Sequence, residues 1–125
     1  MNAVKTALSK IMLAAALLAG VGLSNTANAG AVGPQASHTD VVRPYATDVY
    51  HVRFYGDEIA RVSVVGDGDS DLDLYIYDEN GNLMDKDDDS TDTCYTAWEP
   101  RWTGQFRIEV VNRGGQYNRY CIRTN

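Results

Sequence analysis

Aspartates occupy every second position in one short stretch near the middle of the chain. The stretch reads GDGDSDLDLYIYDENGN over residues 66–82, with aspartates at 67, 69, 71 and 73. Carboxylate oxygens on a flexible loop suit Ca²⁺, whereas Mg²⁺ demands a stricter octahedral geometry and retains more water. The spacing therefore predicts a calcium site, and Ca²⁺ is the one cofactor expected. The candidate ligands in this stretch are Asp67, Asp69, Asp71 and Asp73.

The loop is not an EF-hand, although the four aspartates would fall at its first, third, fifth and seventh positions. Leu72 stands where that motif needs a glycine for its sharp turn, and Asp78 replaces the bidentate glutamate. The residues that follow alternate like a strand, so the motif's second helix is missing as well.

A hairpin predicted around Asn80-Gly81 supplies further carboxylates. A two-residue turn there sets Asp73 opposite Asp88, and a three-residue turn sets Asp73 opposite Asp87. In either register two aspartates face each other across the ladder, which is destabilising without a counterion.

We favour the three-residue turn, because it places Met84 opposite Ile76 on the apolar face. Extending that pairing brings the 67–71 loop beside residues 87–89 and Asp92, so Asp87 and Asp88 join the candidate ligands. The alternative is that the hairpin frays first and leaves two solvated acidic loops.

Catalytic residues are not expected, and the chain is not predicted to be an enzyme. His38 and His51 are the only histidines, and no Gly-x-Ser-x-Gly or comparable elbow accompanies them. The many aspartates could supply a glycosidase pair, but they cluster on loops without an apolar pocket.

Four aromatic residues form a possible ligand face. Tyr75 and Tyr77 lie opposite the apolar face of their predicted strand, and Trp98 and Trp102 flank a short Glu-Pro-Arg segment. Exposed rings of this kind stack on sugars or grip a polypeptide. For the tryptophans we favour the alternative that they plug the ends of the core; for the tyrosines both readings stay open.

Cys94 and Cys121 are the only cysteines. An even count in an exported chain predicts one structural disulfide between them.

Residues 1–29 are predicted to be a signal peptide. Lys5 and Lys10 precede an apolar run over 11–23, and Ala27-Asn28-Ala29 provides an A-x-A cleavage site. The run is too short to span a bilayer comfortably, so no membrane association is expected after cleavage. The mature protein is therefore expected to be secreted or periplasmic.

Apolar and polar residues alternate along several stretches of the chain, and this period of two places the candidate residues on strands. The apolar positions are Tyr50, Val52 and Phe54; Val62 and Val64; Leu72, Leu74 and Ile76; Phe106, Ile108 and Val110; and Tyr120 and Ile122. Turn-forming residues separate these runs, and no helical stripe is present. The sequence predicts an all-β fold, an antiparallel β-sandwich of about seven or eight strands.

The mature chain is expected to be one domain at residues 48–125, preceded by a flexible arm at 30–47 with at most a short strand at Val41-Val42. Without Lys5 and Lys10 it has 9 basic and 17 acidic side chains, a net charge of −8. That sign disfavours nucleic acid as a partner. A monomer is expected.

The chain resembles the bacterial pre-peptidase C-terminal (PPC) domain. The resemblance is carried by the Tyr-x-x-x-Phe opening at Tyr50, by Asp71-Leu-Asp-Leu-Tyr-Ile-Tyr-Asp, and by the run from Trp102 to Asn112 followed by Tyr120. It implies a jelly-roll-like β-sandwich attached to secreted hydrolases, in which Asp71 and Asp73 occupy the acidic positions ahead of a strand. Some such modules bind calcium and aid secretion, folding or substrate attachment.

Together these features predict an exported, non-catalytic module, stabilised by Ca²⁺, with a binding or accessory role toward a protein or polysaccharide. The alternative is a structural or inhibitory envelope protein that recognises another protein through its exposed aromatic sheet face.

Overall fold

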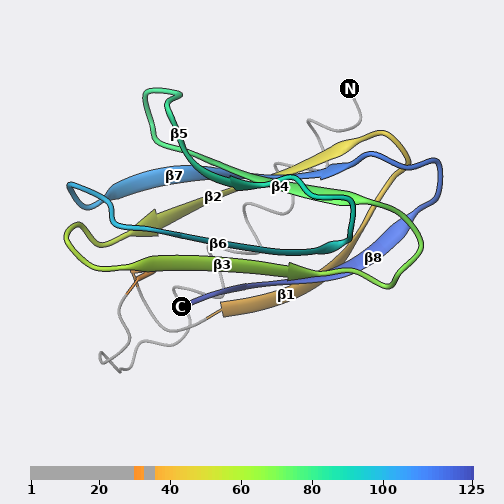
Figure 1. The fold of residues 1–125 in the computed structure, drawn as a ribbon. Coiled ribbons are helices and arrows are strands. Elements are labelled where there is room, and N and C mark those ends of the chain that lie inside the picture. Colours follow the sequence, from red (N-terminus) through yellow and green to blue (C-terminus); the bar gives the residue numbers. More distant parts are fainter. Residues whose placement is uncertain (1–29, 33–35) are drawn as a thin grey trace.

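The computed structural model describes residues 30–32 and 36–125, which form two four-stranded antiparallel sheets packed face to face (Figure 1). One sheet has the order β1–β8–β3–β6, with bounds Ala36–Val42, Asn118–Thr124, Ala60–Val65 and Thr93–Trp98. The other has the order β2–β7–β4–β5, with bounds Thr47–Phe54, Gly104–Asn112, Leu72–Tyr77 and Leu83–Asp87. The predicted all-β sandwich is confirmed.

The core lies between the sheets and contains every apolar residue that the alternation placed inward. It includes a group of three aromatic rings, with the Phe54 centroid 5.0 Å from that of Trp98 and 5.9 Å from that of Phe106. Edge-to-face contacts of this kind add to the stabilisation that burial provides.

The first strand corrects the expected arm. Residues 36–42 form β1 and pair with β8 along their whole length, from Ala36 opposite Thr124 to Val42 opposite Asn118. The sequence pattern hid this strand because two of its inward side chains, His38 and Asp40, are polar.

The β4–β5 hairpin follows the favoured register only at its first pair, Tyr77 with Leu83. A bulge then shifts the ladder, so Ile76 pairs with Asp85 and not with Met84. The favoured pairing is therefore wrong beyond the turn, where the pairs from Ile76 to Leu74 are those expected for the alternative two-residue turn. The ladder ends at Leu74, one residue short of any aspartate pair that would involve Asp73.

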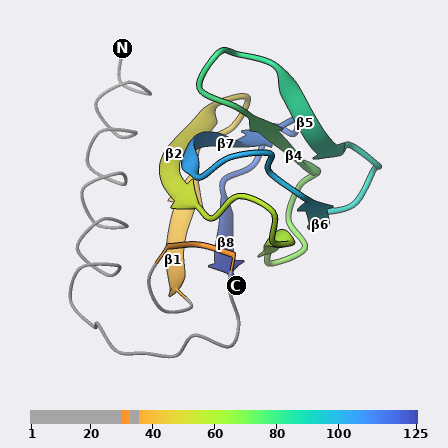
Figure 2. The ribbon, with the colours of Figure 1, turned by 90° about the vertical axis from the view of Figure 1, so that its left-hand side faces the viewer.

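In this shifted register, two aspartates of β5 contact the edge strand β6. β5 and β6 are edge strands on the same side of the molecule, opposite β1 and β2 (Figure 2). Asp85 and Asp87 accept hydrogen bonds from the main-chain N–H groups of Ala97 and Tyr95, both at 2.9 Å. Main-chain groups of β6 that would otherwise be open to another strand are thereby occupied.

The predicted disulfide is wrong, because both cysteines are free thiols. Cys94 pairs with buried Val64 and points inward, whereas Cys121 pairs with exposed Val65 and points outward. β3 lies between their strands, so their Cα atoms are about 9–10 Å apart. A disulfide needs less than about 7 Å and facing side chains.

The predicted signal peptide, residues 1–29, lies outside the described residues. Among residues 30–32 and 36–125, no helix is long and apolar enough to cross a bilayer.

The two thiols should differ in reactivity. The Cys94 thiol donates to the Leu72 carbonyl at 3.2 Å, and burial, together with the carboxylate of Asp87, raises its pKa to about 12. We expect iodoacetamide to alkylate Cys121 in the native protein and Cys94 only after unfolding, as read by peptide mass spectrometry. A native mass two hydrogen atoms lower than the sequence requires, restored by reductant, would contradict the free-thiol structure.

Candidate functional site

Two buried asparagines organise the loops at the acidic end of the sandwich. Asn112 accepts hydrogen bonds from the Ser70 hydroxyl at 2.8 Å and from the Gly114 N–H at 2.9 Å. Its amide nitrogen donates to the carbonyls of Val42, Arg43 and Gln116.

Asn118 connects the same loops from the neighbouring sheet. It accepts the Asp67 N–H at 3.2 Å and donates to the Ser70 hydroxyl at 3.1 Å and to the Asp92 carboxylate at 3.0 Å. The 66–71 and 88–92 loops therefore converge, as the sequence predicted.

Most of the converging carboxylates are occupied by nearby groups. Asp67 accepts the N–H groups of Asp69 and Arg119, Asp87 accepts the Tyr95 N–H, and Asp88 pairs with Lys86 at 3.0 Å. Asp92, which also lies in the cluster, accepts the Gly68 N–H at 2.6 Å. Asp69 is exposed.

Asp71 and Asp73 differ from these, because each has a buried Oδ1 atom without a hydrogen-bond partner. Asp73 is only 4% exposed, and its other oxygen accepts the Arg113 Nε–H at 2.7 Å. An unpartnered buried carboxylate oxygen is costly, so a cation beside the pair would be stabilising. The donor chemistry of these two residues fits Ca²⁺.

Burial raises the pKa of Asp71, and the carboxylates of Asp73 and Asp89 raise it further. The positive charge of Arg113 opposes this effect and lowers the pKa of Asp71. Among the described residues, no group of three or more acidic, histidine or cysteine side chains is already arranged around one metal position.

The predicted tyrosine face lies on the outer side of β4. The Tyr75 and Tyr77 rings stack with centroids 6.5 Å apart, and the Arg107 guanidinium lies 4.4 Å from the Tyr77 centroid. Arg113 donates to the Tyr75 hydroxyl at 3.0 Å, and Arg107 donates to Glu109 at 2.9 Å. Both tyrosines are partly buried, and their polar neighbours are paired with one another.

The two tryptophans do not join this face. Trp98 is 8% exposed and packs on Phe54 and Phe106, so its expected place at the end of the core is confirmed. Trp102 is 46% exposed beside a hollow of about 260 Å³ that Met84 and Phe106 also line, so the same expectation is wrong for Trp102.

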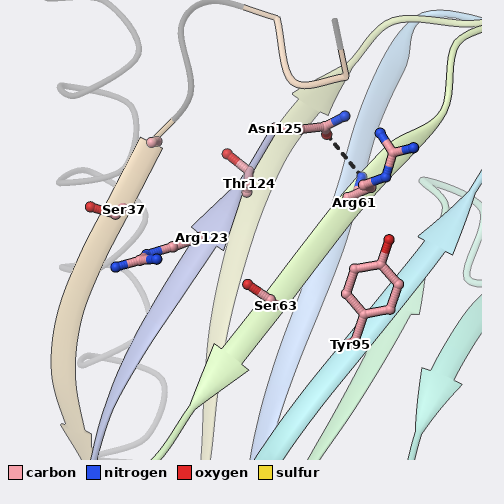
Figure 3. A pocket seen from close by; sticks show the side chains of 8 residues that line it. Ser37, Arg61, Ser63, Tyr95, Arg123, Thr124 and Asn125 are labelled. Carbon is pink, nitrogen blue, oxygen red and sulfur yellow. Dashed lines mark hydrogen bonds between the residues drawn. The ribbon is translucent and has the colours of Figure 1, made fainter. Parts of the chain in front are cut away.

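The outer face of the other sheet carries a groove of about 510 Å³ (Figure 3). We call it the arginine groove and define it by Ser37, Arg61, Ser63, Tyr95 and Arg123. The register places Ser37, Arg123, Ser63 and Tyr95 in one row across the four strands. Arg61 precedes Ser63 by two residues on β3 and so lies on the same face.

The arginine groove was not predicted from the sequence. Arg61 and Arg123 do stand at outward positions of alternating stretches, but 62 residues separate them in the chain. Only the pairing of β3 with β8 makes them neighbours.

The histidines lie apart. His38 is on β1, its ring edge-on to Tyr50 and its Nε2 3.3 Å from an Asp40 carboxylate oxygen. His51 is on the outer side of β2, opposite Arg107, and burial and that arginine lower its pKa.

Solved structures with the same fold include a collagenase domain and a periplasmic lysozyme inhibitor. The chain is similar to the pre-peptidase C-terminal domain of collagenase from Bacillus anthracis, with a TM-score of 0.65 and 12% identity over 82% of this chain and 100% of that one. It is also similar to PliG of Aeromonas hydrophila, a periplasmic inhibitor of g-type lysozyme, with a TM-score of 0.58 and 11% identity over 82% and 91%.

The expected resemblance to the PPC domain is therefore confirmed at the level of the fold. No protein-family model and no curated protein matches the sequence.

Replacing Asp71 by asparagine should stabilise the protein in calcium-free buffer at neutral pH. A carboxyl whose folded pKa is raised stabilises the fold below its unfolded pKa of about 3.9, and that contribution is lost as pH rises through the folded pKa. We therefore expect Asp71→Asn to raise the Tm by a few degrees at pH 7 and to have little effect at pH 3, as measured by calorimetry. A lower Tm at pH 7 without calcium would contradict this account.

Proposed function

We propose that this chain is an exported, non-catalytic module that attaches to a protein or polysaccharide partner through the arginine groove. The observation that carries the proposal is the contrast between the two outer faces. Beside Tyr75 and Tyr77 the charged groups pair with their own neighbours. Around the arginine groove, the guanidinium groups of Arg61 and Arg123 make no ion pair with any described residue.

Export is supported by the signal-peptide pattern of residues 1–29 and by the fold. One of the two similar proteins, the lysozyme inhibitor PliG, is periplasmic by its name.

A non-catalytic role is supported by the position of the histidines. His38 faces the interior and His51 faces outward from a different sheet. Neither makes a hydrogen bond to a serine, threonine or cysteine in the described part of the chain. A nucleophile and its base need to lie within hydrogen-bond reach.

The alternative, an inhibitory or structural envelope protein acting through Tyr75 and Tyr77, has less support. A partner docking there would have to compete with the contacts that Arg113 and Arg107 already make with these rings. Groups that are already paired gain little from a new partner.

Calcium is proposed as a stabilising ion at Asp71 and Asp73, in place of the six ligands that the sequence predicted. Support comes from the two unpartnered buried oxygens and from the raised pKa of Asp71. The other four predicted ligands are exposed or already bonded to nearby groups.

Ser63→Trp should abolish attachment without unfolding the protein. Ser63 lies on β3 and forms the floor of the arginine groove. Aromatic side chains are well tolerated in strands, so the variant with tryptophan in this position should fold. Its ring would fill the groove and exclude any ligand. We expect the purified wild-type protein, but not the variant, to be retained on at least one member of a panel of polysaccharides and immobilised secreted hydrolases.

The matched control is Gln105→Trp, an exposed outward position on β7 of the other sheet. Its retention should equal that of the wild type, and both variants should keep a wild-type circular dichroism spectrum. Equal retention of Ser63→Trp would remove the groove from the proposal, and no retention on any member would contradict a binding role.

Calcium should raise the Tm of the wild-type protein. Binding to the folded state at 100 times the Kd contributes about 2.7 kcal/mol. For a domain of this size that corresponds to a shift of roughly 10 °C or more. We expect titration calorimetry to show one site, with Mg²⁺ at the same concentration giving a much smaller shift.

Asp71→Asn should remove this calcium shift, whereas Asp57→Asn, in the loop at the opposite end of β3, should keep it. An unchanged Tm of the wild type in millimolar Ca²⁺ would remove the ion from the proposal and leave the binding role untouched.

A further inference from the structure

The outer face of the β1–β8–β3–β6 sheet has a charge opposite to that of the whole chain. The chain has a formal net charge of −6. The outward side chains of the four strands nevertheless include no aspartate or glutamate. They are Ser37, Thr39, Val41, Arg61, Ser63, Val65, Thr93, Tyr95, Ala97, Arg119, Cys121 and Arg123.

The register sets two arginines around one small residue. Arg123 lies directly opposite Ser63. Arg61 is the diagonal neighbour of Arg123, with the Cα atoms of the two arginines about 7–8 Å apart. The short serine side chain lies between the two arginines in the lining of the groove. The close view shows both arginines and the Ser63 hydroxyl on the same side of the sheet (Figure 3).

Tyr95 forms the wall on the other side of Ser63. It pairs with Ser63 across the β3–β6 ladder, and its side chain is 54% exposed. A free aromatic ring packs against the flat C–H face of a sugar, and its hydroxyl can bond a sugar oxygen. Ser37 adds a second hydroxyl beyond Arg123.

The two arginines are available for a ligand. The main-chain N–H of Arg61 donates to the Asn125 side chain at 2.9 Å, but its guanidinium forms no ion pair with a described residue. On the other sheet, Arg107 and Arg113 are paired with Glu109 and Asp73. A planar guanidinium binds a carboxylate through two parallel hydrogen bonds, which a neutral sugar cannot match.

We infer that the arginine groove binds an acidic polysaccharide, with the carboxylates of its uronic acid residues on Arg61 and Arg123 and a sugar ring on Tyr95. The inference rests on the proposed binding role and names the ligand class. The groove crosses the sheet as an open row of side chains, so it fits a chain of sugars better than a small ion in a closed cavity. Charge complementarity selects an anionic polymer.

The test compares polygalacturonate with its fully methyl-esterified form, which keeps the sugar rings and removes the charge. We expect the purified protein to bind polygalacturonate in titration calorimetry and the ester at least about tenfold more weakly. Affinity should fall as NaCl is raised from 50 to 300 mM, because salt screens exposed charges.

Variants assign the contacts. Arg61→Gln and Arg123→Gln should each weaken binding about fivefold, the double variant about twentyfold or more, and Tyr95→Ala about fivefold. Arg53→Gln, an exposed arginine on the outer side of β2, is the matched control and should bind as the wild type does.

Three outcomes would overturn the inference: equal affinity for the ester, tighter binding of dextran sulfate than of polygalacturonate, or binding of poly-glutamate in place of the polysaccharide. If Ser63→Trp abolishes retention on another partner while polygalacturonate does not bind, the ligand class is wrong and the proposed function stands. If the wild-type protein is retained on no member of the panel, both the inferred ligand class and the proposed function are wrong.

Discussion

Two buried amides hold one end of this sandwich together. An asparagine donates and accepts at once, so Asn112 and Asn118 between them satisfy main-chain groups of the loops after β1, β3 and β7. An aspartate at either position would offer only acceptors and would bury a charge. Because both asparagines are at most 1% exposed, their hydrogen bonds set the path of every loop around them.

The acidity of that end follows largely from loop construction. Tight loops leave main-chain N–H groups without a ladder partner, and carboxylates such as those of Asp67 and Asp92 accept them. Asp85 and Asp87 do the same for the edge of β6. Most aspartates are therefore explained without a metal, and among the aspartates of the described residues only Asp71 and Asp73 retain an unpartnered buried oxygen.

The two outer faces differ in whether their charged side chains are paired. On the β2–β7–β4–β5 sheet, Arg107 pairs with Glu109 two residues further along β7, and Arg113, just after β7, pairs with Asp73 of β4. On the other sheet the outward positions of β3 and β8 carry arginines and no acid, so the guanidinium groups stay open to solvent. Exposed charges held on rigid strands and left unpaired are better placed for a ligand than those already satisfied.

The sequence by itself determined the strands and their inward faces, because a period of two is a local property that Tyr50–Phe54 and Leu72–Ile76 show plainly. The sequence also predicted that the acidic loops lie together at one end of the sandwich. It missed β1, where His38 and Asp40 break the apolar pattern, and it paired Cys94 with Cys121, which β3 in fact separates. The bulge after Ile76 and the meeting of Arg61 with Arg123 depend on contacts between distant segments. Strand order and register arise from packing of the whole chain, so only the tertiary structure could decide them.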